Sequence, residues 1–187
     1  MLAKVEDAMI ERCRELVGDR LKAIEDLPGN WDEATLAAAR RNVPGIYIAW
    51  SGGSAVTSGR PMINGRYAVY VVTGHASGER ARRRGNGRDI GAYEILERVV
   101  PGLHGLSVDG VGTLRLERVD NLYSDQGDKK GVVVYGAVFT IDKMPFPAAK
   151  DASSLADFEI FHTTSKVPDG PDTEGHHVFP NGNEATP

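Results

Sequence analysis

TLRLERVDNLYSDQGDKKGVVVYGAVFTIDKM, residues 113–144, is the stretch that decides the fold. Its first part alternates apolar and polar residues through Leu114, Leu116, Val119 and Leu122, with one slip of phase that indicates a β-bulge. A turn sequence, DQGDKKG, separates this part from a second run that is rich in valine and aromatic residues. Two alternating runs joined by a short turn predict a long antiparallel hairpin.

Two more strands are predicted upstream of this hairpin. VPGIYIAW (43–50) is β-branched and aromatic, and GRYAVYVVTGH (65–75) is dense in valine and tyrosine. The glycine-serine cluster after the first run predicts that residues 51–64 form a loop or hairpin tip. DRLKAIEDL (19–27) is ambiguous between a strand and a further helical turn, and we favour the strand.

Three segments have the period of an amphipathic helix. The first covers residues 2–16 and is expected to end at Gly18, and the second lies within GNWDEATLAAARRN (29–42). The third lies within DIGAYEILERVVPGLHGL (89–106), where Asp89 or a neighbour is expected to cap the helix.

Two details of the third helix follow from single residues. Its aliphatic face, which includes Leu96, is expected to be buried against the sheet. Pro101 is expected to end or kink the helix near Val100, because proline cannot donate the helical hydrogen bond.

This order of elements predicts an α+β fold, a single mostly antiparallel sheet with helices packed on one face. We expect a domain over residues 1–144 and an extended acidic C-terminal arm over 145–187, where prolines and acids replace aliphatic residues. The arm contains the strand-like sequence DFEIFHTT, and we expect Phe158, Ile160 and Phe161 to anchor it on a neighbouring subunit.

Composition and charge indicate a soluble folded protein. The 187 residues are 41% hydrophobic and 26% charged, with a formal net charge of −4. Residues 151–187 hold seven acids and one base, so the first 150 residues sum to +2. The N-terminus has no apolar signal-peptide core, and the longest membrane-like run is about half of a spanning helix. We therefore expect synthesis in a cytoplasm and no membrane partner.

Signatures of catalysis and metal binding are absent from the sequence. Cys13 is the single cysteine, which excludes an internal disulfide and a multi-cysteine metal site. We expect its thiol to be buried, since it falls on the apolar face of the first helix. His176 and His177 are adjacent, so their side chains diverge in an extended chain. We therefore expect no catalytic residue, metal or cofactor, and no enzyme.

A basic segment carries the candidate functional residues. Its five arginines fall within nine positions and are Arg80, Arg82, Arg83, Arg84 and Arg88. The glycines that follow are spaced G-x-G-x-x-x-G, which does not match a dinucleotide fingerprint, and the chain has no P-loop. We expect a flexible loop that is solvated, binds an acidic protein surface or contacts DNA phosphates without reading sequence.

Three features of the chain are the proline-led strand ending at Gly52 and Gly53, the RRG…GAYEIL segment, and the DF…H pattern of the arm. Together they resemble the Mu-like phage tail protein family. The resemblance implies a structural virion protein, a tail terminator or tail-completion protein of contractile-tailed phages. It implies a homo-oligomeric ring, usually a hexamer, at the head-proximal end of the tail, assembled in the host cytoplasm.

The resemblance also implies the partners of such a ring. These are its own copies, the tail tube protein, the tail sheath and the neck or connector proteins, with possible non-specific contact to DNA in the lumen. The alternative is a nucleic-acid-binding module that uses the arginines between Arg80 and Arg88. Against it, no aromatic residues are interleaved with these arginines, and the first 150 residues are only weakly basic.

Overall fold

The computed structural model describes residues 1–27, 33–57, 59–76, 78–122, 131–149, 160–165 and 173–178. The chain divides into two compact units, Met1–Pro147 and Ala148–Pro187. The sequence predicts a domain over residues 1–144 and an arm over 145–187 that docks on a neighbouring subunit. The roles of both parts stay predictions.

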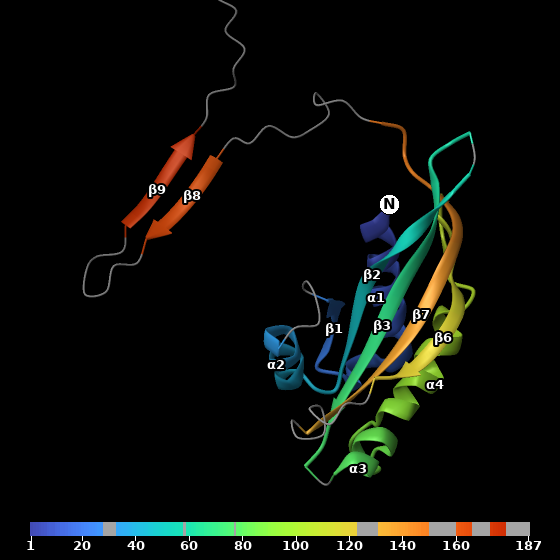
Figure 1. Ribbon diagram of the computed structural model, residues 1–187. Helices are drawn as coiled ribbons and strands as arrows, with labels where there is room; N and C mark the ends of the chain where they lie inside the picture. Colours follow the sequence, from blue (N-terminus) through green and yellow to red (C-terminus); the bar gives the residue numbers. More distant parts are fainter. Residues whose placement is uncertain are drawn as a thin grey trace, which may run out of the picture. The chain divides into compact units, whose positions relative to one another are not determined.

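A five-stranded sheet forms the centre of the first unit, in the order β1–β2–β3–β7–β6 (Figure 1). The strands are β1 (Ala23–Asp26), β2 (Gly45–Val56), β3 (Met62–Gly74), β6 (Arg115–Asn121) and β7 (Val132–Pro145). β1 runs parallel to β2, and all other neighbours are antiparallel. The predicted α+β fold with a mostly antiparallel sheet is confirmed.

The predicted hairpin at the end of the domain is confirmed as β6 and β7. The expected bulge lies between Leu116 and Arg118, where the pairing register shifts. The turn between the strands falls largely outside the described residues. A small two-stranded sheet of β4 (Ser107–Val108) and β5 (Gly112–Thr113) precedes the hairpin.

The glycine-serine segment after the first predicted strand is mostly strand, so the expected loop over 51–64 was too long. β2 continues to Val56 and β3 starts at Met62, with a register shift between Trp50 and Gly53. A glycine is required at Gly65, because a Cβ there would lie 2.3 Å from the sulfur of Met144 and 2.9 Å from the Trp50 ring. Gly65 therefore allows close packing across a strand, whereas Gly52, with a φ of +92° and no atom within 4 Å of an added Cβ, lies at the register shift.

Two helices, α1 (Leu2–Val17) and α4 (Ala92–Leu103), pack on one face of the sheet (Figure 1). The core combines Val5, Met9, Cys13, Ile95, Val99 and Leu103 from the helices with Ile46, Val69, Phe139 and Ile141 from the strands. Cys13 is fully buried as predicted, and burial raises the pKa of its thiol to about 12. The first helix stops where expected, at Gly18, and a short 3₁₀ turn, η1 (Gly18–Arg20), follows.

The second predicted helix, α2 (Glu33–Arg41), differs from the other two in its position. Its Ala39 packs with Tyr47, Val72 and Val132 in a separate small cluster. Tyr47 alternates along β2 with Ile46 and Ile48, which belong to the main core, so this cluster lies on the opposite face. α2 therefore covers part of the sheet face that we expected to be free of helices.

The third predicted helix, α4, begins later than expected. It starts at Ala92 after Gly91, and no side chain caps its first turn, so the prediction that Asp89 caps it is wrong. Pro101 lies inside the helix, which continues to Leu103. Ile95 is fully buried, whereas Leu96 is only half-buried.

The second unit contains one antiparallel pair, β8 (Ile160–Ser165) and β9 (Thr173–Val178). Of the three expected anchors, Ile160 pairs with Val178 and Phe161 pairs with His177. Phe158 lies outside the described residues. No helix in the described part of the chain is long and apolar enough to cross a membrane.

Candidate assembly surface around the arginine-rich segment

The arginine-rich segment, expected to be a flexible loop, begins as a short helix, α3 (Glu79–Arg84). Glu79 and Arg83 are four positions apart and form an ion pair, with Arg83 Nε 2.6 Å from Glu79 Oε1. The helix ends at Gly85, whose N–H donates to the carbonyl of Ala81 over 2.8 Å and whose φ is +74°. A run of arginines has good helix propensity, so the loop prediction gave too much weight to the following glycines.

The glycines after α3 allow the end of this helix to touch the start of α4. A Cβ on Gly91 would lie 2.2 Å from the Gly85 nitrogen and 2.5 Å from the Arg83 carbonyl oxygen. A Cβ on Gly85 would lie 2.5 Å from the carbonyl oxygen of Asp89. All of these are backbone atoms, so the glycines serve close packing of two helix ends rather than a phosphate site.

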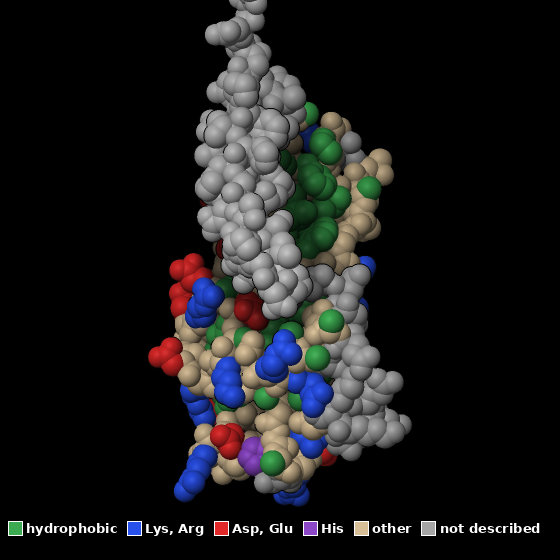
Figure 2. Space-filling model, turned by 90° about the vertical axis from the view of Figure 1, so that its left-hand side faces the viewer, with side chains coloured by type: hydrophobic (Ala, Val, Ile, Leu, Met, Phe, Trp, Pro, Cys, Tyr) green, Lys and Arg blue, Asp and Glu red, His purple; other side chains and the backbone are tan. Residues whose placement is uncertain are grey.

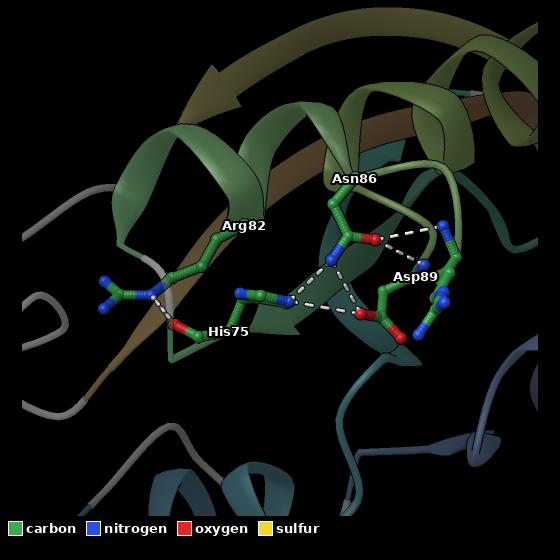
Figure 3. Close-up of polar contacts among 5 residues, drawn as sticks. His75, Arg82, Asn86 and Asp89 are labelled. Carbon is green, nitrogen blue, oxygen red and sulfur yellow. Dashed lines mark hydrogen bonds and ion pairs between the residues drawn. The ribbon is translucent and has the colours of Figure 1, made fainter.

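The turn between the two helices is held by Asn86 and Asp89 (Figure 3). The Asn86 Oδ1 accepts hydrogen bonds from the backbone N–H groups of Arg88 and Asp89, at 3.0 and 2.8 Å. The Asn86 Nδ2 donates to Asp89 Oδ2 over 3.0 Å, and His75 Nε2 lies 3.1 Å from the same oxygen. Asp89 therefore stabilises the turn and its link to His75 instead of capping α4.

Arg82 is buried and fastens α3 to the end of β3. Only 8% of Arg82 is exposed, and its Nε donates to the His75 carbonyl over 3.1 Å (Figure 3). Its own carbonyl accepts a 2.7 Å hydrogen bond from Thr73 Oγ1, which is also buried. These two bonds make Arg82 a structural residue of the subunit.

Arg83 is half-buried and bound to groups of its own subunit. Its Nη1 donates to the Tyr93 hydroxyl over 3.0 Å, and its guanidinium lies 5.8 Å from the centre of the Tyr93 ring. The hydroxyl of Tyr135 donates to that of Tyr93 at 3.5 Å. The bonds from Tyr135 and Arg83 lower the pKa of Tyr93, while burial raises the pKa of Tyr135 to about 12.

The other three arginines, Arg80, Arg84 and Arg88, are exposed. Their guanidinium groups make no ion pair or hydrogen bond with any residue that the structure describes. The five predicted residues thus divide into two that hold the subunit together and three that face solvent. Their expected role in assembly or along the DNA path stays a prediction.

A basic pocket lies next to this segment, and the sequence analysis did not find it. It has a volume of about 660 Å³ and lies between the end of α2 and the ends of β3 and α3, with Arg40, Arg41, His75 and Arg82 in its lining. Figure 2 shows the side of the molecule that carries α2, where Lys and Arg side chains gather over the lower half. Arg40 and Arg41 fall within the predicted helix of residues 29–42, but nothing in the sequence places them near Arg82.

The described residues contain no group of three or more His, Cys, Asp or Glu side chains placed to hold a metal ion. A family model described as bacteriophage Mu, Gp37 matches residues 1–143. The chain belongs to this family.

Two relatives cover most of the chain. The Mu-like prophage FluMu protein gp37 of Haemophilus influenzae is 30% identical over 164 residues, which are 88% of this chain and 80% of the relative. A protein of Escherichia phage Mu, described as a probable tail terminator protein, is 34% identical over 170 residues, 90% of this chain and 88% of the relative.

A solved structure, a chain of the virion of the native gene transfer agent particle, is also similar in part. The match has a TM-score of 0.45 and 14% sequence identity. It covers 74% of this chain and 93% of the chain of the solved structure.

Membership of the Gp37 family confirms the predicted resemblance to Mu-like phage tail proteins. Of the three sequence features behind that prediction, two lie within the residues that the family model matches and one lies outside them. The strand ending at Gly52 and Gly53 and the arginine-rich helix lie inside residues 1–143, whereas the DF…H pattern of the arm lies beyond them.

Proposed function

We propose that this protein is the tail terminator of a Mu-like phage, a structural virion protein of the tail. In this role it forms a ring on the head-proximal end of the tail tube and joins the tail to the neck. The observation that carries the proposal is the 34% identity to a probable tail terminator protein over 88% of that protein's length.

Two chemically different sheet edges support the proposed ring. A closed ring uses two different surfaces of each subunit, because each copy contacts its neighbours head to tail. The edge strand β6 carries Arg115, Glu117, Arg118 and Asp120 and contains a bulge, features that discourage strand addition. On the other side, β1 pairs only with Gly45–Ile48, so the outer edge of residues 51–56 has no described strand partner.

The outer edge of β2 suits an added strand better than β6 does. Residues 51–56 contain no charged side chain. Just before them, the Trp50 N–H donates to Glu6 Oε1 over 2.9 Å, and burial raises the pKa of Glu6. From Ser51 onward, a neighbouring chain that adds a strand would gain main-chain hydrogen bonds.

The arm is proposed to contact a neighbouring subunit. β8 and β9 form a two-stranded sheet, and such a hairpin is marginal by itself in water. Docking on another surface would stabilise it, with Ile160 and Phe161 as candidate anchors. Exposed apolar side chains that would suit subunit contacts are Val119, Leu122 and Phe146.

The exposed arginines have two places in this proposal. In a ring, Arg80, Arg84 and Arg88 would face either an acidic surface of a partner protein or the phosphates of DNA in the lumen. Neither contact reads a base sequence, because the guanidinium groups would bind charge alone.

The proposal is tested by removing the protein from a phage that encodes it. A terminator ends the growth of the tail tube, so particles without it should contain tubes of variable length that lack heads. Supplying the wild-type protein in trans should restore uniform tails in electron micrographs. Tails of normal length that join heads without the protein would rule the proposal out.

A further inference from the structure

The basic pocket beside α2 has a lining that favours an anionic ligand. Arg40 and Arg41 come from the last turn of α2, and Arg82 comes from α3. The side chains of Arg40 and Arg41 are exposed and make no ion pair or hydrogen bond within the described part of the chain. No acidic side chain is among the described lining residues. Exposed guanidinium groups beside a concavity bind carboxylates or phosphates through charge-assisted hydrogen bonds.

The geometry of the pocket favours a chain segment over a nucleic acid. A duplex presents its phosphates along a rigid, convex cylinder, and such a surface suits an extended basic stripe. The pocket is instead a concavity of about 660 Å³, a size that accepts several side chains of a polypeptide. These features favour an acidic peptide segment as the ligand.

The chain itself contains a segment of this kind. Residues 151–187 hold seven acids against one base, and three of the acids, Asp169, Asp172 and Glu174, fall within six residues. Residues 148–168 separate this group from the first unit and reach about 70 Å when extended, which is enough to reach another subunit.

We infer that the two exposed arginines of this pocket, Arg40 and Arg41, bind the acidic group Asp169, Asp172 and Glu174 of a neighbouring copy, while the buried Arg82 supports the pocket wall through its bond to the His75 carbonyl. This inference rests on the proposed ring, since it requires adjacent copies. It specifies where the arm docks: the carboxylates of one subunit bind the guanidinium groups of the next. The body of the chain is +2 and residues 151–187 are −6, so the contact joins the oppositely charged parts of two copies.

The test uses charge reversal in full-length protein. A pocket variant carries Arg40→Glu and Arg41→Glu, and an arm variant carries Asp169→Lys, Asp172→Lys and Glu174→Lys. Association between differently tagged copies is measured by light scattering and pull-down at fixed ionic strength. Each variant alone should associate at least tenfold more weakly than wild type. A control with Lys4→Glu and Lys143→Glu, two exposed lysines that are not among the described lining residues of the pocket, should associate like wild type.

Mixing the two variants decides whether the contact is between copies. In a mixture, every pocket can meet an arm of opposite charge on another subunit, so association should return to within about threefold of wild type. A chain that carries both sets of changes should also associate, which shows that the altered residues still fold. Recovery in the doubly changed chain but not in the mixture would place the contact within one subunit and overturn the inference.

The remaining outcomes separate this contact from the proposed function. If pocket reversal abolishes salt-dependent binding to duplex DNA while arm reversal leaves association unchanged, the pocket binds nucleic acid and the inference is wrong. If both reversals leave association unchanged but tails are still terminated normally, only the inference fails. If copies bind through pocket and arm but tails grow to normal length without the protein, the proposed function fails and the inference stands.

Discussion

Arg82 and Arg84 occupy the same short helix, two positions apart, and have opposite environments. Arg82 is buried and bonded to the end of β3, whereas Arg84 is exposed with no described partner for its guanidinium. Two residues that are two positions apart on a helix point about 200° away from each other. Arg82 and Arg84 have the same chemistry but therefore face opposite sides of the helix. The arginines of α3 thus form two sets, one buried or bonded within the subunit and one exposed to solvent.

The same contrast occurs one helix later. Ile95 and Leu96 are adjacent in α4, but Ile95 is fully buried in the main core and Leu96 is half-buried at its margin. In both helices the orientation of a side chain decides its role more than its type does.

The largest expected effect is at the most buried of these positions. Ile95→Ala should reduce the free energy of unfolding by about 2–5 kcal/mol, because it leaves a cavity in a closely packed core. Leu96→Ala should cost clearly less, since its side chain already contacts solvent. Urea unfolding followed by circular dichroism measures both, and equal losses would contradict the assignment of the two sides of α4.

The contact between the two helix ends comes next. Gly91→Ala should destabilise the protein by about 1–3 kcal/mol, because the new methyl group meets backbone atoms that have little room to move. Gly87→Ala is the matched control, since a Cβ there meets no atom within 4 Å and only its φ of +86° is unfavourable. Thermal melts should rank Gly91→Ala below Gly87→Ala, and the reverse ranking would contradict the close packing of α3 against α4.

Arg82 and Arg84 should also differ in what they contribute to the free energy of unfolding, with the buried residue contributing more. Arg82→Met should lower the free energy of unfolding by about 1–2 kcal/mol, because the His75 carbonyl loses its donor in a partly buried site. Arg84→Met should change it by no more than about 0.5 kcal/mol, as is usual for an exposed residue. Chemical denaturation of both variants is the measurement. Indistinguishable midpoints would mean that burial does not separate these arginines.

The smallest effect on stability is expected for the exposed set. Replacing Arg80, Arg84 and Arg88 together with Ser should leave the melting temperature nearly unchanged, because no described residue depends on their guanidinium groups. Under the proposed function, the same change should lower the yield of completed tails in a complementation assay. A wild-type yield would show that these arginines are simply solvated.

The periodic parts of the chain were predictable and the packed turns were not. The long alternation in 113–144 predicted β6 and β7 together with their bulge, because a strand exposes its two faces in strict succession. Gly65 falls in a predicted strand and Gly91 near the start of a predicted helix, yet both are positions of close packing. Gly65 packs against Trp50 and Met144, which come from other strands, and Gly91 packs against the end of a helix that the sequence did not predict. The basic pocket was missed for the same reason, since α2 and α3 are separated by two long strands.

The sequence by itself determined the three longer helices α1, α2 and α4, the antiparallel strands, the buried thiol of Cys13, the acidic arm and the family, because these follow from local periodicity, composition and a recognisable order of motifs. Only the tertiary structure decided that the side chains of Arg82 and Arg83 bond within their own subunit, whereas those of Arg80, Arg84 and Arg88 face solvent. It also decided that Arg40 and Arg41 share a pocket with Arg82. Burial and proximity are non-local properties, since the groups that cover a side chain come from elements distant along the chain. Identical residues in one run acquired different roles only when those elements packed together.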